Sequence, residues 1–467
     1  MQAYLTRPVR TRPGTRVGAT YALPVDALSP AALEDECKRL TLQARCTFGK
    51  PPPPFCAYHI ADGVLHLPRF FGLRRFGAAE HDDRSLGDPA SEHLRFFGTL
   101  TEVQTRADQT IHRGGYGPNG DGGTIVCLPC GYGKTVFAIH QACKLGRRTF
   151  VLVHKAVIRD QWRESFERFC PGVRVGIVQG DVCEMDARFD VVVGMIMTVV
   201  RRDVPVDAYD SFGFIVCDEA HHLAAPVMNQ ALQRFRAARV MGLTATPERP
   251  DGLTPLLHWS LGDEGFRVER ESEGVRVSIA LFAGGTREIT TRGGTHPLVA
   301  VMVNQLATNQ RRNRFIAERI MAYRATGRVI MVLSDRLVQL DALRTLVVGM
   351  GLAEEDVGVF KGGQRDEERT RQLARPVVMC SFGMANEGVD KREADTLVLA
   401  TPKSRVVQGV GRIQRPCPTK KSPLVLDVVD DVSVFPGMRW TRQRWYSKEG
   451  YAVQVHAADT DADNWFA

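Results

Sequence analysis

The chain has 467 residues, enough for about three domains with sizeable cores. Its composition is 44% hydrophobic and 24% charged, as in soluble globular proteins, and this excludes a largely disordered chain. The formal net charge of +8 suits a polyanionic partner. No apolar run is long enough to cross a bilayer, and the first residues lack the apolar core of a secretory signal. We therefore expect an intracellular protein that is neither secreted nor membrane-embedded.

The predicted elements fall into three parts. Residues 1–90 are irregular and predict a small N-terminal accessory module. Over 91–268, short apolar runs alternate with amphipathic ones, which predicts buried parallel strands joined by crossover helices. Residues 269–297 are weakly patterned and are predicted to be a linker, and the alternation resumes over 298–467. The sequence thus predicts an α/β fold with two tandem domains after the N-terminal module.

A glycine-rich segment, PCGYGKT, lies between a predicted strand and a predicted helix. Its glycines let several backbone N–H groups converge on phosphate oxygens, and the N-terminus of the following helix adds its positive dipole end. Lys134 would reach the phosphates, and the Thr135 hydroxyl would ligate Mg²⁺. Leu128 stands where the strict pattern has its first glycine. The candidate nucleotide-binding residues are Pro129, Cys130, Gly131, Tyr132, Gly133, Lys134 and Thr135.

Two other interpretations of this segment stay open. One is a glycine-rich turn with a surface lysine. The other is a metal site, because Cys127 and Cys130 have the spacing of a paired ligand set, although no second such pair accompanies them.

A second candidate segment, FGFIVCDEAHH at 212–222, is an apolar strand that ends in acidic residues. Such positions lie at the carboxyl edge of a parallel sheet, where these sheets bind ligands. Asp218 would hold Mg²⁺ through water, and Glu219 would orient and deprotonate the attacking water. His221, in the same segment, is a further catalytic candidate. An acidic turn that begins a helix is the alternative.

The segment LTATP follows another predicted strand. Its hydroxyl residues, Thr244 and Thr246, could pass hydrogen bonds between a nucleotide site and its surroundings. A strand end capped by threonines is the alternative.

In the later α/β domain, QGVGRIQR places Gln408, Arg412 and Arg415 on one face of a predicted helix. An arginine supplied across a cleft stabilises the charge of phosphoryl transfer. We therefore expect two domains to close on one nucleotide. A solvated basic helix face is the alternative.

These motifs, in this order, resemble those of the superfamily 2 helicases, whose motor is two tandem RecA-like domains. DEAHH with GLTATPERPDG is similar to the XPB-type helicases. LPRFFG with GRIQRP and SPLVLDVVDDVSVF is similar to the XPB-like helicases of large nucleocytoplasmic DNA viruses, the poxvirus transcript-release type included. The resemblance implies ATP and Mg²⁺ as cofactors. It also implies that Gln104 of LTEVQ reads adenine, and that Gly388 and Asp390 of NEGVD lie at the nucleotide site.

The same resemblance implies nucleic-acid contacts. Thr198 would lie near the bound strand, and the N-terminal module has a family counterpart linked with damage or duplex sensing. The segment RWTRQRWYSKEGY interleaves basic and aromatic residues, which makes Arg442, Arg444 and Trp445 candidates for a stacking surface. A C-terminal helix whose tryptophans pack on the second domain is the interpretation that we favour.

The sequence therefore predicts an ATP-dependent DNA helicase or translocase that moves 3′ to 5′, in viral-type transcription, repair or replication. An RNA or DNA–RNA hybrid helicase is the first alternative. The second, from another class, is a non-catalytic clamp subunit of a transcription complex that uses ATP as a switch. The expected partners are single-stranded DNA or a duplex junction, then RNA, then transcription or repair proteins. The expected location is the host nucleus or cytoplasm, or the virion.

Overall fold

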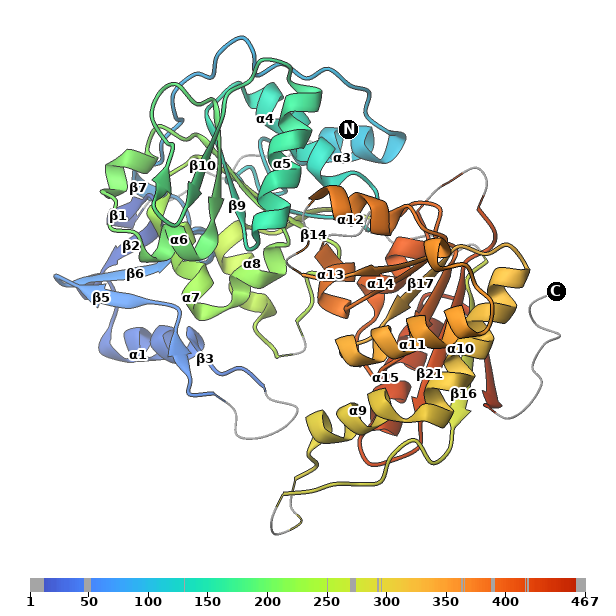
Figure 1. The fold of residues 1–467 in the computed structure, drawn as a ribbon. Coiled ribbons are helices and arrows are strands. Elements are labelled where there is room, and N and C mark those ends of the chain that lie inside the picture. The colour runs from blue at the N-terminus through green and yellow to red at the C-terminus, as the bar shows by residue number, and fades with distance from the viewer. Residues whose placement is uncertain are drawn as a thin grey trace, which may run out of the picture. The chain divides into compact units, whose positions relative to one another are not determined.

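The computed structural model describes residues 12–45, 52–129, 131–249, 251–268, 274–291, 294, 296–362, 364, 366–387, 391–415, 417 and 420–458. The chain divides into two compact units, residues 1–269 and 270–467, each built around a parallel sheet (Figure 1). Among the described residues, no helix has both the length and the apolar character needed to cross a membrane.

The main sheet of the first unit runs in the order β11-β10-β12-β9-β13-β14-β8-β15. Its neighbouring strands are parallel except for the antiparallel pair β10 and β11. The strands are β8 (Gly123–Cys127), β9 (Thr149–Val153), β10 (Val175–Gln179), β11 (Val182–Cys183), β12 (Val191–Met195), β13 (Phe214–Cys217), β14 (Arg239–Thr244) and β15 (Glu264–Arg267). The helices are α3 (Glu102–His112), α4 (Lys134–Leu145), α5 (Ala156–Phe169), α6 (Ile196–Arg201), α7 (Pro226–Asn229) and α8 (Thr254–Leu261).

Both faces of this sheet are buried, which explains why its central strands are continuous apolar runs. Alternate strand residues point to opposite faces. Val151 and Val193 pack with α4 and α5 on one face, whereas Phe150 and Leu152 pack with α6 and α8 on the other. The predicted alternation of strands and crossover helices is therefore confirmed in this unit.

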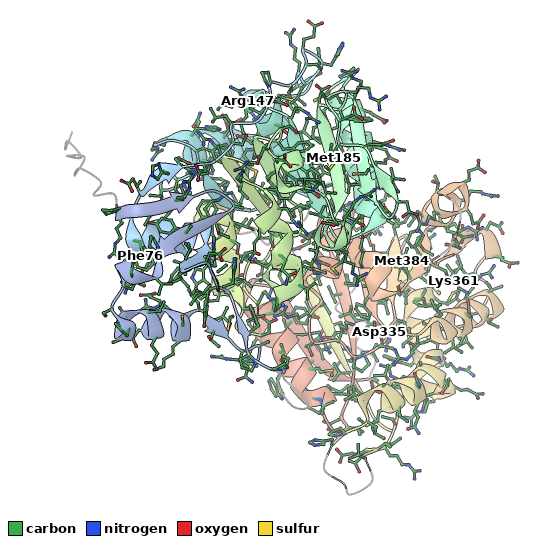
Figure 2. All side chains as sticks on the ribbon, turned by 90° about the vertical axis from the view of Figure 1, so that its left-hand side faces the viewer. Phe76, Arg147, Met185, Asp335, Lys361 and Met384 are labelled. Carbon is green, nitrogen blue, oxygen red and sulfur yellow. The ribbon has the colours of Figure 1, made fainter. Side chains whose placement is uncertain are left out.

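A second, N-terminal sheet belongs to the same unit and runs in the order β5-β6-β2-β1-β7. Its elements are β1 (Arg12–Val17), β2 (Thr20–Pro24), α1 (Pro30–Arg39), β5 (His59–Ala61), β6 (Val64–Pro68), α2 (Arg69–Phe76) and β7 (Ala79–Asp82). Figure 2 shows side chains filling this region, where Phe76 packs with Tyr21. The buried guanidinium of Arg69 donates to the backbone oxygens of Phe235 and Ala237, both at 2.7 Å. These bonds fix the N-terminal sheet to the main sheet.

The second unit is built on a parallel sheet in the order β18-β19-β17-β20-β21-β16-β22. Its strands are β16 (Arg276–Phe282), β17 (Ile330–Leu333), β18 (Val357–Phe360), β19 (Val377–Cys380), β20 (Thr396–Leu399), β21 (Leu424–Asp430) and β22 (Ala452–Ala457). Its helices are α9 (Val299–Thr308), α10 (Gln310–Ala325), α11 (Leu337–Gly349), α12 (Asp366–Leu373), α13 (Phe382–Glu387), α14 (Val407–Ile413) and α15 (Phe435–Lys448). Helices α10 and α11 pack on one face, and α13, α14 and α15 on the other.

The predicted linker over 269–297 needs a correction. Residues Arg276–Phe282 form β16, which pairs in parallel with β21 and β22 inside the second sheet. The side chains of Val277 and Ile279 are fully buried there. The paired residues of β21 lie about 150 residues later in the chain, and those of β22 lie later still, so tertiary contacts decide the conformation of this short segment.

Candidate functional site

The phosphate loop connects β8 to α4 in the first unit. Gly131 and Gly133 have φ of 91° and 73°, in the left-handed region that favours glycine. Helix α4 begins at Lys134, so its N-terminal N–H groups face the end of the loop. The Lys134 amine donates to the Leu128 carbonyl at 3.1 Å, which holds it against the preceding part of the loop. Cys130 lies outside the described residues.

Gln104 holds the phosphate loop in place. Its amide Nε2 donates to the carbonyls of Tyr132 at 3.2 Å and Gly133 at 3.1 Å, and its Oε1 accepts from the N–H of Thr101 at 2.8 Å. The last bond belongs to the capping box that begins α3. Both N–H donors of this 3% exposed side chain are thus engaged with the loop. The predicted contact with adenine is untested and stays a prediction.

Asp218 is a buried carboxylate with two neutral donors. Its Oδ2 accepts from the indole Nε1 of Trp162 on α5 at 2.7 Å, and its Oδ1 accepts from the N–H of Glu219 at 2.9 Å. Burial, and next the charge of Glu219, raises the pKa of Asp218, against the opposing effects of Trp162 and Lys134. A buried carboxylate whose hydrogen-bond donors, among the described residues, are all neutral fits a bound cation.

Glu219, His221, Thr244 and Thr246 come together beside Asp218. Glu219 has φ of 45°, a conformation that is strained for a residue other than glycine. Its carboxylate lies 3.5 Å from Nδ1 of His221, and this nitrogen lies 3.3 Å from Oγ1 of Thr244. The same Thr244 oxygen accepts from the N–H of Thr246 at 3.1 Å. The acidic segment that ends in DEAHH and the segment LTATP are therefore joined by one series of polar contacts.

The imidazole rings of His154 and His221 pack next to His222, and the sequence did not predict this. The His222 ring is 4.0 Å from the His154 ring and 4.4 Å from the His221 ring, measured between centroids. Burial, and then the neighbouring histidines, lowers the pKa of His222 to about 3. Burial likewise lowers the pKa of His154. Both rings are therefore neutral at physiological pH, which suits packing beside an acidic site.

The metal interpretation of the pair Cys127 and Cys130 is untested, because Cys130 lies outside the described residues. Its thiol is buried and donates to Oε2 of Glu264 at 3.3 Å, and burial raises its pKa. In the part of the chain that the structure describes, no cluster of three or more His, Cys, Asp or Glu side chains is arranged to hold a metal ion. Cys127 is thus a buried thiol of β8 that contacts Glu264.

In the second unit, α14 carries Gln408 and Arg412 four residues apart, on one helix face. Arg415 lies beyond the end of this helix, which corrects the predicted three-residue face. The sequence gives the reason, because Arg415 precedes Pro416 and a residue before proline disfavours helical geometry. Gly388 and Asp390 lie outside the described residues.

Several known proteins are similar in sequence to this chain. A family model described as "Type III restriction enzyme, res subunit" matches residues 98–249. A protein of Acanthamoeba polyphaga mimivirus called an ATP-dependent RNA helicase is 29% identical over 399 residues, 84% of this chain and 76% of its own. A protein of African swine fever virus (strain Badajoz 1971 Vero-adapted) with the same description is 25% identical over 359 residues, 70% of this chain and 69% of its own.

A DNA 3′-5′ helicase XPB of Mycobacterium tuberculosis is 25% identical over 390 residues, which are 77% of this chain and 66% of that protein. The chain is thus similar, over most of its length, to helicases of superfamily 2. Its relatives confirm the predicted similarity to XPB and to helicases of large DNA viruses. They also confirm that it is an enzyme, a nucleic-acid-dependent ATPase.

The C-terminal helix of this helicase corrects part of the predicted nucleic-acid surface. Arg442 is only 2% exposed, and its Nε and Nη2 bond to the Asp427 carboxylate at 2.7 and 2.8 Å. Trp445 is half-buried and packs against the core beneath α15. Only Arg444, of the three predicted contacts, is exposed. Arg442 is buried because a guanidinium can neutralise a buried carboxylate, which the sequence pattern alone did not show.

Thr198 lies on the short helix α6 of the helicase. Its Oγ1 accepts from the N–H of Gly180 at 3.4 Å, so the side chain links α6 to the turn that follows β10. It is half-buried, and its contact with nucleic acid stays a prediction.

The sequence also missed Trp162 as a residue of the site. Ile158, Trp162 and Phe166 recur every four residues on α5, and this spacing predicts a buried stripe. The indole N–H of a buried tryptophan needs an acceptor. The stripe could not reveal that the acceptor is Asp218, which is 56 residues away in the chain.

Proposed function

We propose that this helicase hydrolyses ATP to move along DNA in the 3′-to-5′ direction. The observation that carries the proposal is the joint presence of Lys134, Asp218 and Glu219 at the carboxyl edge of the first sheet. Phosphoryl transfer depends on positioning and charge stabilisation, which these groups supply. The similarity to a DNA 3′-5′ helicase XPB supports DNA as the track and gives the direction.

The residues of the site fit a bound nucleotide. The loop N–H groups and Lys134 would bind the phosphates, and Thr135 with Asp218 would hold Mg²⁺, Asp218 through water. When bound, ATP·Mg²⁺ supplies the phosphoanhydride bond and neutralises the phosphate charge. Glu219 would orient a water molecule and accept its proton. His221 and Thr244 keep Glu219 in one position through the polar contacts described above.

The second unit would complete this chemistry. Arg412 and Arg415 would contact the phosphates when the two units close, and Gln408 would contact the attacking water or the phosphate. A positive charge from another domain makes hydrolysis depend on closure. Repeated closing and opening would then move one unit along the strand.

A strand-displacement assay tests this proposal. The substrates are DNA duplexes with either a 3′ or a 5′ single-stranded tail, and DNA–RNA hybrids with the same tails. We expect ATP-dependent separation of the 3′-tailed DNA duplex, and none with Glu219→Gln. Separation of only 5′-tailed substrates would contradict the direction. If the parent and Glu219→Gln turn over ATP equally, the role of Glu219 is wrong.

RNA is the second candidate track, because the mimivirus and African swine fever virus relatives are both called ATP-dependent RNA helicases. Single-stranded DNA and RNA of one sequence distinguish the two through their stimulation of ATP turnover. A larger kcat/KM for DNA supports the proposal, and stimulation by RNA alone contradicts it. Measurable multiple turnover eliminates a clamp that uses ATP only as a switch.

A further inference from the structure

Helix α15 has a solvent-exposed face that the motor motifs do not explain. Its opposite face is fixed inside the second unit, where Arg442 and Tyr446 both bond to the Asp427 carboxylate. On the outer face, Trp440, Arg444 and Lys448 recur every four residues and are all exposed. The helix is therefore held rigidly while it presents these three side chains to solvent.

The exposed face carries an aromatic ring among positive charges. Trp440 is 52% exposed, and the Arg439 guanidinium lies 4.5 Å from the centroid of its ring. The helix contains no Asp or Glu. Within the residues that the structure describes, Arg444 and Lys448 take part in no ion pair with another side chain. The face thus has an excess of positive charge that no acid of α15 neutralises.

Such a surface matches single-stranded nucleic acid. An exposed tryptophan offers a ring on which an unpaired base can stack, and stacking tolerates any base sequence. Cations along the same helix face can contact successive phosphates, because residues four apart lie about 6 Å apart along the axis. A purely solvated face would not need a half-exposed tryptophan, since a large aromatic ring is usually buried.

We propose that Arg439, Trp440, Arg444 and Lys448 form an accessory contact for single-stranded nucleic acid on the second unit. The inference rests on the proposed function, because the strand is the one along which the helicase moves. Arg439 lies over the Trp440 ring, a base stacks on the exposed part of that ring, and Arg444 and Lys448 contact phosphates. This contact adds affinity without sequence preference. Of the two tryptophans in the segment RWTRQRWYSKEGY, Trp440 is exposed and Trp445 is half-buried, so Trp440 takes the stacking role.

The test measures the affinity of the full chain for a fluorescent single strand by anisotropy at several salt concentrations. Stacking is worth about 1–3 kcal/mol per base, so Trp440→Ala should weaken binding by about 5-fold or more. Arg444→Ala should reduce the slope of log K against log salt by about 0.7, the value for one phosphate contact on a single strand. Arg314→Ala is the matched control, because the Arg314 side chain on α10 is 72% exposed.

The results of this experiment distinguish a failure of the α15 contact from a failure of the proposed function. If the parent binds the strand and both α15 variants bind it with unchanged affinity and slope, the contact is wrong and the motor proposal stands. An equal loss with Arg314→Ala shows a general charge effect and also overturns the contact. If single strands neither bind the parent nor stimulate its ATP turnover, the proposed function itself fails. Circular dichroism spectra and melting temperatures equal to the parent's show that the variants are folded.

Discussion

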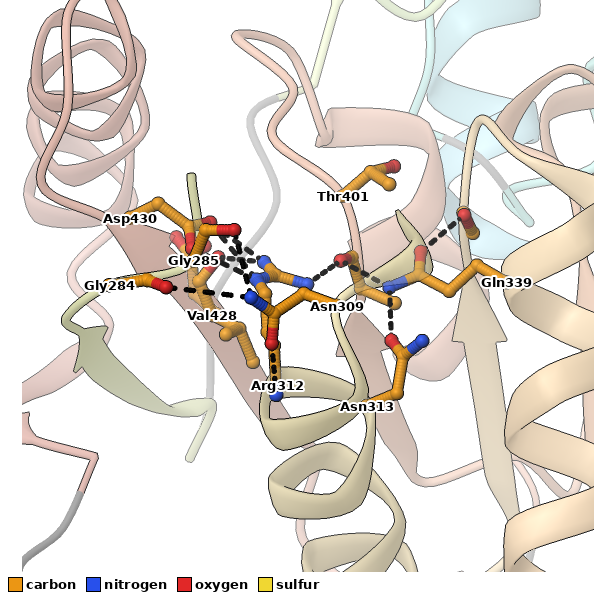
Figure 3. Close-up of polar contacts among 12 residues, drawn as sticks. Gly284, Gly285, Asn309, Arg312, Asn313, Gln339, Thr401, Val428 and Asp430 are labelled. Atoms are coloured by element: carbon orange, nitrogen blue, oxygen red, sulfur yellow. Dashed lines mark hydrogen bonds and ion pairs between the residues drawn. The ribbon is translucent and has the colours of Figure 1, made fainter. Parts of the chain in front are cut away.

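Each of the two units contains a buried carboxylate, and the two differ in whether their hydrogen-bond donors are neutral or cationic. In the first unit, Asp218 accepts hydrogen bonds from neutral groups, the indole of Trp162 and a backbone N–H. In the second, Asp430 is bonded by Arg312 through Nε at 3.0 Å and Nη2 at 2.9 Å, with both side chains fully buried (Figure 3). Burial raises the pKa of both carboxyls, but only Asp430 has a guanidinium to neutralise it.

This difference distinguishes a structural carboxylate from a functional one. Arg312 also donates to the carbonyls of Ala400 and Val428, so it joins three segments of the second unit (Figure 3). A buried pair of this kind is costly to break, because the remaining partner keeps an uncompensated charge. In the part of the chain that the structure describes, the donors to Asp218 are an indole and a backbone N–H, so this carboxyl can bind a cation that arrives with the substrate.

The largest expected effect follows from removing the functional charge. Asp218→Asn should lower nucleic-acid-stimulated ATP turnover by about 100-fold or more, as is usual when a group that stabilises transition-state charge is lost. The melting temperature should stay equal or rise, since the substitution removes a buried charge. Turnover assays and thermal melts of the same preparation check both. A large fall in stability would show that Asp218 is structural.

For the buried ion pair of Arg312 and Asp430 we expect a loss of stability when the carboxylate is removed. Asp430→Asn should destabilise the second unit by about 3–5 kcal/mol, because Arg312 remains buried without its counter-charge. Urea unfolding followed by circular dichroism measures this loss. The double variant Asp430→Asn with Arg312→Met should recover part of it, and a double variant as unstable as the single would contradict the explanation.

A smaller effect should come from the donor that orients Asp218. Trp162→Phe removes the indole N–H and keeps most of the aromatic packing. We expect the Mg²⁺ concentration for half-maximal ATP turnover to rise about 10-fold, a typical cost for an outer hydrogen-bond partner of a metal-binding group. The turnover rate at saturating Mg²⁺ should change less. Phe166→Leu, in the same buried stripe, is the control, and an equal Mg²⁺ shift there would indicate a packing effect.

The smallest expected effect is the dependence of folding stability on pH through His222. The folded-state pKa of His222 is about 3, below the usual 6.5, so the unfolded chain binds a proton that the folded chain excludes. This contribution to stability is complete above pH 6.5 and is lost progressively as the pH falls toward 3. At pH 5 the loss should be about 1–2 kcal/mol. Melting temperatures of the parent and His222→Gln at pH 7.5 and 5 measure it, and parallel pH profiles would contradict the assignment.

The parts of this site that the sequence predicted are those encoded by short local patterns. The glycines around Tyr132 and the acids after β13 each follow a recognisable apolar strand, and the two hydroxyls lie at the end of β14, so their place at one sheet edge could be inferred. The same holds for the alternation of strands and helices in both units. The strand β16 was missed, because its pairing with β21 is decided by residues far away in the chain.

Side-chain partners could not be predicted in the same way. The segment around α15 has basic and aromatic residues on both faces, so its composition did not show that Arg442 points inward and Trp440 outward. A buried arginine depends on a counter-charge such as Asp427, whose position is set by the fold. The contact between Trp162 and Asp218 has the same origin, since it joins two motifs that the chain keeps apart.

The most direct test of the account is ATP turnover by the parent and by Lys134→Ala, with and without single-stranded DNA. The Lys134 amine lies in the phosphate loop, so its loss should leave the fold intact and remove the group that binds the phosphates. We predict turnover that DNA stimulates in the parent and that is absent from Lys134→Ala under both conditions. Equal turnover by the two proteins would contradict the assignment of this loop as the nucleotide site.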